Sequence, residues 1–376
     1  MSPRRPIDVA LPAERVLLVG APRKGTRDAR HVHEHLDELA RLADTAGAVV
    51  VDRVVQALEA PSPEFYIGRG KVEEVAALLP AMGATLAIFD EELSPNQGRH
   101  LEDAFKVRIM DRTELILDIF ALRARSREAH AQVELAQLEY LLPRLTRMWV
   151  HLSRIRGGIG LRGPGETQLE TDRRLIRQKI GALKKDMGRV AEHRARTRER
   201  TRSRGVMRVA LVGYTNAGKS SLLRALTGSE AHVEDRLFAT LDTLSRETVI
   251  AGRRVRFTDT VGFIRKLPHD LVASFRATLE EALDADVLLH VVDAAHPVWE
   301  DQARVVDAAL EDAGVTGERR VVVVLNKADR LSEDDRGDRL ARTEERGWEA
   351  LLVSALTKDG VEALARRMAG DAGAGA

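Results

Sequence analysis

Short apolar runs alternate with helix-like stretches in the first and last thirds of the 376-residue chain. Consecutive apolar residues are typical of strands buried on both faces, whereas apolar residues three or four positions apart are typical of helices. This alternation favours an α/β fold with a largely parallel sheet. The expected strands cover residues 15–20, 48–52, 85–89, 107–110, 208–213, 256–260, 287–293, 321–325 and 351–354, and the expected helices of the first part cover 28–46, 71–79 and 96–105.

The middle of the chain, residues 126–204, has no β-branched runs and repeats its apolar residues at helical intervals. The spacing predicts two long antiparallel helices, the second with a heptad-like seam. Between them, residues 151–166 contain five glycines and one proline, which exclude a continuous helix and predict a flexible loop. The two apolar stripes are Val133, Leu138, Leu141, Leu145 and Met148, and Leu169, Ile176, Ile180, Leu183, Met187 and Val190.

These patterns divide the chain into separate parts. We expect an N-terminal α/β domain at residues 1–125, a helical hairpin at 126–204 and a second α/β domain at 205–369. Residues 370–376 consist almost entirely of glycine and alanine, so we expect a disordered tail.

Composition excludes several classes of protein. The absence of cysteine excludes disulfides, thiolate metal sites and a cysteine nucleophile. No window approaches the ~18 consecutive apolar residues of a membrane span, and no apolar segment follows the charged N-terminus as in a signal peptide. We therefore expect a cytoplasmic protein without stable membrane insertion, and we expect a monomer. Aromatic residues are 4% of the chain, which argues against RNA binding by base stacking.

A phosphate-binding loop directly follows the expected strand at 208–213. The segment Gly213-Tyr-Thr-Asn-Ala-Gly-Lys-Ser220 fits GxxxxGK[ST] and precedes a helical run. Glycines let backbone N–H groups surround phosphate oxygens, Lys219 would reach the β- and γ-phosphates, and the Ser220 hydroxyl would ligate Mg²⁺. The predicted nucleotide-contacting residues here are Gly213, Tyr214, Thr215, Asn216, Ala217, Gly218, Lys219, Ser220 and Ser221.

A second motif selects guanine over adenine. The carboxylate of Asp329 can accept from the N1–H and N2–H₂ groups of guanine, whereas adenine offers no such donor pair. Sites built to hydrogen-bond a substrate group can reject its absence by about 10⁴-fold. The residues at the carboxyl ends of the last two expected strands form this side of the pocket. The motif itself is Asn326, Lys327, Ala328 and Asp329, and the next strand end supplies Ser354, Ala355 and Leu356 as a backbone contact to the guanine O6.

Two further segments are expected to sense the γ-phosphate. Asp259 would hold Mg²⁺ through water, and the Gly262 N–H would contact the γ-phosphate. A threonine from residues 237–243 would close on the metal, and we select Thr240 over Thr243. The segments contribute Phe238, Ala239, Thr240, Leu241 and Asp242, and Asp259, Thr260, Val261 and Gly262; the predicted metal ligands are Ser220, Thr240 and Asp259, and the predicted catalytic residues are Lys219, Thr240 and Gly262.

Together these motifs resemble the HflX family of ribosome-associated GTPases. The resemblance extends upstream to the segments 157–170 and 66–74, so it covers nearly the whole chain. Only 22 residues follow Ser354, so we do not expect the extra C-terminal domain that many family members carry. The resemblance implies binding to the large ribosomal subunit and splitting of stalled ribosomes into subunits, notably under heat stress. A ribosome-assembly GTPase and a passive, GTP-gated RNA- or ribosome-binding factor remain alternatives.

Phe263 follows the γ-phosphate segment, where many GTPases place a glutamine that orients the attacking water. Phenylalanine has no hydrogen-bonding group. The resemblance agrees, because the family has a hydrophobic residue there. We expect slow hydrolysis by the free protein and acceleration by a large partner. A purely structural role for Phe263, packing against the next helix, is compatible with this expectation.

Basic residues concentrate in the helical hairpin. Between residues 173 and 204, Lys and Arg number 13 and acidic residues number 3. Such a helix and a Gly/Arg loop suit an RNA phosphate backbone, and a solvated connector is the alternative. Arg154, Arg156 and Arg162 flank glycines of the loop and are the predicted RNA-binding residues.

Three weaker signals favour structural interpretations. The histidines at positions 31, 33 and 35 resemble a metal cluster, but only His31 and His35 would share a helix face. The segment 68–71 lacks the full spacing of a phosphate loop and is interpreted as a turn into a helix. Asp293 ends an expected strand and is interpreted as structural.

Overall fold

The computed structural model describes residues 13–145, 165–202, 205–228, 237–238, 244–266, 284–314 and 320–370. The chain forms two compact units, Met1–Ile119 with Pro143–Gly158, and Phe120–Leu142 with Ile159–Ala376. Each unit contains a sheet built largely from parallel strands, so the predicted α/β fold class is confirmed. None of the helices within the described residues has the length and apolar character that crossing a bilayer requires.

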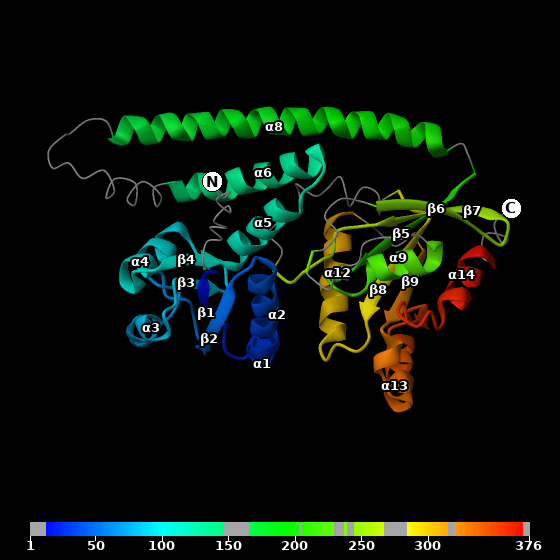
Figure 1. The fold of residues 1–376 in the computed structure, drawn as a ribbon, viewed down its shortest axis with the longest axis horizontal. Coiled ribbons are helices and arrows are strands. Elements are labelled where there is room, and N and C mark those ends of the chain that lie inside the picture. The colour runs from blue at the N-terminus through cyan, green and yellow to red at the C-terminus, as the bar shows by residue number, and fades with distance from the viewer. Residues whose placement is uncertain are drawn as a thin grey trace, which may run out of the picture. The chain divides into compact units, whose positions relative to one another are not determined.

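The first unit has a four-stranded parallel sheet in the order β2-β1-β3-β4 (Figure 1). The inner strands β1 and β3 are short and apolar because helices cover both faces. Side chains of α3 and α4 cover one face and α2 packs on the strands β1 and β2. The elements are β1 (Arg15–Gly20), α1 (Arg27–Arg30), α2 (Val32–Thr45), β2 (Val49–Val55), α3 (Arg69–Met82), β3 (Leu86–Phe89), α4 (Pro95–Phe105), β4 (Arg108–Asp111) and α5 (Arg112–Arg123), whose last residues belong to the second unit.

The weaker motifs of this unit have structural partners. Gly68 is the N-cap of α3, and its N–H donates to the Gln56 Oε1 atom at 2.9 Å. The Lys71 ammonium pairs with Glu74 at 2.7 Å. The segment 68–71 therefore begins a helix, as predicted, although the helix starts two residues earlier than expected. His31 caps α2, and the described residues contain no cluster of three metal-ligating side chains.

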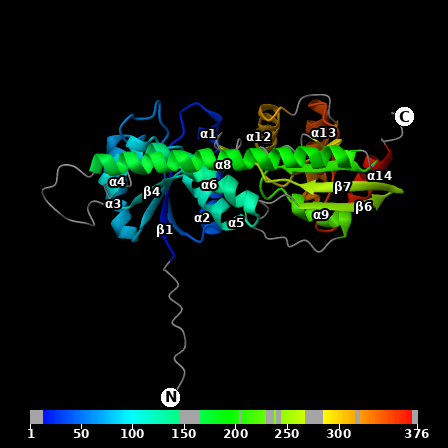
Figure 2. The same cartoon turned by 90° about the horizontal axis from the view of Figure 1, so that it is seen from above.

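Two helices, α6 (Arg127–Leu141) and α8 (Gly165–Arg202), lie side by side and run antiparallel (Figures 1 and 2). The Ser126 hydroxyl caps α6 by accepting from the Ala129 N–H at 3.0 Å. A short 3-10 turn, Leu142–Arg144, follows α6. Ile180 and Leu183 of the predicted seam are half-buried, and ion pairs join Lys179 to Glu134 and Lys184 to Glu139. The predicted helix pair is confirmed, whereas most of the glycine-rich loop lies outside the described residues.

The sheet of the second unit has six strands in the order β10-β9-β8-β5-β7-β6. All neighbouring strands are parallel except the edge pair β6 and β7. After β5 the chain adds β6 and β7 on one side of β5, and later it crosses over to add β8, β9 and β10 on the other side. The order of the strands therefore reverses at β5. The elements are β5 (Met207–Gly213), α9 (Lys219–Thr227), β6 (Leu244–Ile250), β7 (Arg253–Asp259), β8 (Val287–Asp293), α12 (Trp299–Asp312), β9 (Arg320–Asn326), a 3-10 turn (Ala328–Arg330), α13 (Glu333–Glu345), β10 (Ala350–Leu352) and α14 (Val361–Gly370).

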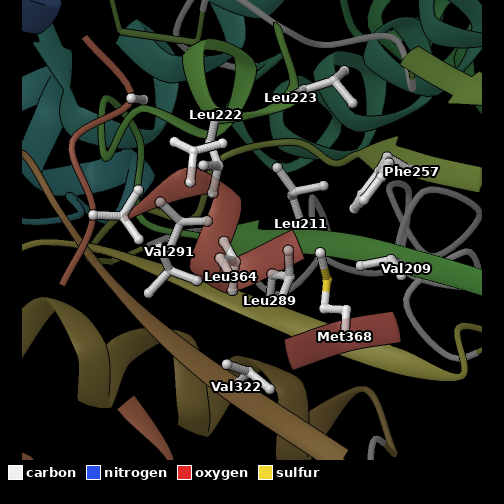
Figure 3. Close-up of a cluster of buried hydrophobic side chains, with 14 of the residues drawn as sticks. Val209, Leu211, Leu222, Leu223, Phe257, Leu289, Val291, Val322, Leu364 and Met368 are labelled. Carbon is white, nitrogen blue, oxygen red and sulfur yellow. The ribbon is translucent and has the colours of Figure 1, made fainter. Parts of the chain in front are cut away.

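Alternate side chains of the parallel strands form the core of this unit. Val209 and Leu211 of β5 meet Leu289 of β8 on one face, under α9 and α14 (Figure 3). On the opposite face, Trp299 of α12 packs in a cluster with Val292 of β8 and with Val323 and Leu325 of β9. With both faces covered, the carboxyl ends of the strands remain as the edge where α/β sheets bind ligands, at the point of strand reversal. This edge carries the predicted nucleotide motifs.

Candidate nucleotide-binding site

The phosphate loop spans the turn from the end of β5 to the start of α9. Gly218 caps α9 with φ +93°, a left-handed conformation that favours glycine. A Cβ atom at this position would also lie 2.2 Å from the Asn326 Nδ2 atom. Glycine is therefore required twice at Gly218, by the backbone turn and by the close approach of the base-side motif.

Lys219 turns its ammonium group into the loop. Its Nζ atom donates to the carbonyl oxygens of Gly213 at 3.2 Å and Tyr214 at 3.0 Å. Burial lowers the pKa of Lys219 to about 8, and the nearby Asp259 carboxylate opposes this shift. The amine is thus in position for phosphate oxygens, whose negative charge would favour its protonated form.

Ser220 and Asp259 meet beneath the loop. The Ser220 hydroxyl donates to the Asp259 Oδ2 atom at 2.6 Å, and the Asp259 side chain is fully buried. Asp259 ends β7 beside β5, because Leu211 is its partner in the parallel register. Thr260 follows it and donates from its hydroxyl to the Leu211 carbonyl at 2.7 Å. The hydrogen bond between Ser220 and Asp259 brings together the two predicted metal ligands that lie within the described residues.

The segment after Asp259 is hydrogen-bonded to the phosphate loop. The Thr215 N–H donates to the Phe263 carbonyl at 2.6 Å, and the Phe263 N–H donates to the Gly213 carbonyl at 3.1 Å. Gly262 lies so close to the loop that a Cβ atom there would be 2.8 Å from the Thr215 Cα and 3.0 Å from the Lys219 Nζ. Gly262 therefore packs directly against the loop and its lysine.

Side chains of the phosphate loop also bind the two segments that are predicted to contact Mg²⁺ and the γ-phosphate. The Tyr214 hydroxyl accepts from the Arg265 N–H at 2.8 Å, and the Thr215 hydroxyl accepts from the Phe238 N–H at 3.1 Å. Phe238 has φ +55° and is buried, with its ring packed edge-on against Phe120 at 4.6 Å between centroids. Two neighbouring loop residues thus connect the phosphate loop to both segments.

The base side is ordered by side-chain hydrogen bonds between strand ends. The Asn326 Nδ2 atom donates to the Ala217 carbonyl at 2.8 Å, and its Oδ1 atom accepts from the Ala355 N–H at 3.0 Å. The Ser354 hydroxyl donates to the Asp329 Oδ1 atom at 2.6 Å. Ser354 is fully buried while Asp329 is exposed, so the carboxylate is held at the surface in a fixed orientation.

The structure brings most of the predicted nucleotide-contacting residues to this one edge of the sheet. Ser221 continues α9 after Ser220, Asn216 has φ +60° within the loop, and the side chain of Leu356 is exposed. Val261 lies between Thr260 and Gly262. The predicted residues Ala239, Thr240, Leu241, Asp242, Arg154, Arg156 and Arg162 lie outside the described residues.

Sequence reasoning missed two side-chain contacts. The backbone contact of Ser354 with guanine stays a prediction, and the structure adds a hydrogen bond from the Ser354 hydroxyl to Asp329. Sequence reasoning also left Lys327 without a partner, and the structure pairs the Lys327 ammonium with Asp293 at 2.7 Å. Both partners end neighbouring strands, and that placement is the one sequence signal that could have suggested the contacts.

Protein-family comparison matches most of the chain. Residues 33–121 match the family described as GTP-binding GTPase N-terminal, and residues 123–201 match the one described as GTP-binding GTPase Middle Region. Residues 208–327 match the family described as 50S ribosome-binding GTPase. The last match contains the phosphate loop and Asn326.

Similar whole proteins carry one name. The GTPase HflX of Caldanaerobacter subterraneus subsp. tengcongensis is 52% identical over 299 residues, which cover 79% of this chain and 70% of that protein. The chain belongs to the HflX family. A further HflX GTPase, that of Escherichia coli (strain K12), is 45% identical over 343 residues, or 90% of this chain and 80% of that protein.

Membership of the HflX family makes this protein a GTPase, which binds GTP and GDP and hydrolyses GTP. A solved structure described as the complex of SsGBP with GDP has a TM-score of 0.53 and 24% identity, and the match covers 95% of this chain and 98% of that one. This likeness supports the shared fold. The HflX resemblance predicted from the motifs is therefore confirmed.

Proposed function

We propose that this HflX-family GTPase binds the large ribosomal subunit and splits stalled ribosomes into subunits under stress. The observation that carries the proposal is the match of residues 208–327 to the family described as 50S ribosome-binding GTPase. The proposal places a monomeric protein in the cytoplasm, where its ribosomal partner resides. The nucleotide state would control binding and release.

The basic surface of α8 supports a ribosomal RNA partner. Arg174, Arg177 and Arg189 are exposed along the described part of the helix. Salt-dependent attraction to phosphates gives such surfaces their affinity for RNA. Arg154 and Arg156 would extend this surface from the loop that precedes α8.

Magnesium would accompany GTP at this site. Mg²⁺ prefers oxygen donors and is usually held by one or two protein groups together with substrate phosphates. The Ser220 hydroxyl and the Asp259 carboxylate, 2.6 Å apart, fit this requirement. Thr240 is the proposed third residue. The bound ion would offset negative charge on the phosphates.

Hydrolysis by the free protein would be slow. Phe263 stands where a water-orienting glutamine would serve, and its main chain is hydrogen-bonded to the phosphate loop. A large partner that orders the sensing segments would supply the missing organisation. Gly262 would donate its N–H to the γ-phosphate, and Lys219 would stabilise the charge that develops on it.

A titration with purified large ribosomal subunits tests the proposal. We expect GTP turnover to rise at least several-fold at saturation, and Arg154→Ala/Arg156→Ala/Arg162→Ala to weaken binding and flatten its salt dependence while GTP affinity is retained. The matched control is Arg253→Ala, which removes an exposed charge on β7 of the GTPase sheet. Unchanged turnover across the titration contradicts the proposal.

Two alternatives have separate outcomes in the same system. A passive factor would read GTP occupancy alone and use hydrolysis only to reset itself, so splitting would be retained with a non-hydrolysable GTP analogue. A ribosome-assembly GTPase would bind immature particles in preference to mature subunits. Cosedimentation with both particles under GTP, GDP and the analogue distinguishes these functions.

A further inference from the structure

An ion pair joins the ends of β8 and β9 beside the base-reading motif. The Asp293 Oδ2 atom lies 2.7 Å from the Lys327 Nζ atom, and the two side chains are only 14% and 18% exposed. Asp293 faces Asn326 in the parallel register of the two strands. The other carboxylate oxygen of Asp293 accepts from the Ala295 N–H at 3.2 Å. The carboxylate is therefore fixed at both oxygens.

Lys327 occupies a constrained position in the motif. Its φ is +65°, in the left-handed region that side chains rarely adopt. The chain is tied on both sides of it, because Asn326 bonds to the Ala217 carbonyl and the Ala328 N–H donates to the Val353 carbonyl at 3.2 Å. The backbone thus sets where the Lys327 side chain starts, and Asp293 sets where it ends.

We propose that Asp293 is a positioning residue for the guanine base. By holding the Lys327 ammonium, it keeps the aliphatic stem of Lys327 extended as a fixed apolar wall beside the ring that Asp329 reads. A long side chain covers apolar surface with its methylene groups while its charged end is bound elsewhere. A stem that is ordered in advance loses little conformational freedom when the nucleotide binds.

The inference depends on guanine-nucleotide binding by this HflX-family domain and not on its ribosomal partner. Ion pairs shielded from water are stronger than exposed ones, because solvent screens them less. A restrained lysine stem contacts the base, which GDP and GTP share. The effect of Asp293 is therefore the same for both nucleotides and independent of the γ-phosphate.

Release rates of fluorescent GDP and GTP from the full chain test this role. Asp293→Asn keeps an acceptor for the Ala295 N–H but loses the charge that binds Lys327. We expect release of both nucleotides to accelerate about tenfold, equivalent to about 1.4 kcal/mol. Asp293→Ala gives at least the same acceleration, and both variants keep the thermal unfolding midpoint of the nucleotide-free parent within a few degrees.

A double-mutant cycle separates positioning from a local structural effect. Lys327→Met keeps an unbranched stem and removes the ammonium, so it releases nucleotide about as fast as Asp293→Asn. The double variant is no faster than Lys327→Met alone, because the two residues act through one contact. Asp286→Asn is the matched control. This substitution weakens the ion pair between Arg208 and Asp286, which lies just before the start of β8, at the end of the strand away from Asp293; the pair has a distance of 2.7 Å. Nucleotide release is expected to stay at the parent rate.

Three results overturn the inference. The first is release of both nucleotides from Asp293→Asn at the parent rate. The second is a double variant in which the increases in release rate from the two substitutions multiply. The third is a change in the release rates of GTP and GDP by different factors. Because no ribosome is present in these assays, a failure of the ribosomal proposal leaves their outcome unchanged.

Discussion

At the scale of single residues, the phosphate loop and the guanine motif were predictable because their chemistry is local in sequence. Gly218, Lys219 and Ser220 are consecutive, and the turn that they form depends on one glycine and one helix start. The contact between Ser354 and Asp329 was harder to predict, because 25 residues separate them and the contact exists only after β9 and β10 pair; the placement of both residues after neighbouring strands was its one signal in the sequence.

Lys219 gives a prediction about protons. Its pKa is lowered from 10.5 to about 8 in the nucleotide-free fold. Between these values the unfolded chain holds more protons than the folded one, so the contribution of Lys219 to stability rises with pH across this interval. Bound phosphates restore the charge of Lys219, so nucleotide binding takes up protons at pH 9 and much less at pH 6.5.

Calorimetry of GDP binding in buffers of different ionisation enthalpy measures this uptake at pH 9. Lys219→Arg is the control, because arginine stays protonated and removes the contribution of this residue. Equal heats in all buffers for the parent protein at pH 9 would contradict the predicted pKa shift.

At the scale of elements, apolar runs identified the buried parallel strands, and their ends shifted by only a few residues. Among the elements that had no predicted range, β6 and α5 show the physical reason most clearly. The edge strand β6 has mostly exposed or half-buried residues, so it lacks the apolar run that marks its neighbours. Helix α5 follows β4 without a turn signal, because Arg112 starts the helix immediately after Asp111 ends the strand.

The bridge between the phosphate loop and residues 263–265 gives a prediction at this scale. Tyr214→Phe removes the hydroxyl that accepts from the Arg265 N–H and leaves the two main-chain bonds of Phe263 in place. We expect amide exchange at residues 263–266 to accelerate several-fold in the nucleotide-free protein, because one of three hydrogen bonds is lost.

Hydrogen-exchange mass spectrometry measures this change. Tyr140→Phe is the matched control, since Tyr140 is a buried tyrosine of α6. Exchange at residues 263–266 that equals the parent rate in Tyr214→Phe would show that the tyrosine hydroxyl does not restrain this segment.

At the scale of the whole molecule, the motifs identified the family, and the alternation of apolar runs identified the fold class. The domain boundaries at residues 125/126 and 204/205 were drawn from changes in composition along the chain, and they stay a prediction. The contacts group α6 and α8 with the GTPase sheet in one compact unit. Composition does not reveal such tertiary contacts, since both units use the same residue types in their cores.

The central claim is that one pocket binds a nucleotide through the phosphate loop and recognises guanine through Asp329. Titration calorimetry of GDP and ADP against the full chain with Mg²⁺ tests it most directly. We predict that GDP binds about 10⁴-fold more tightly than ADP, because adenine lacks the N–H donor pair that the Asp329 carboxylate accepts from guanine. Equal affinities for the two nucleotides, or no binding of either, would contradict the account.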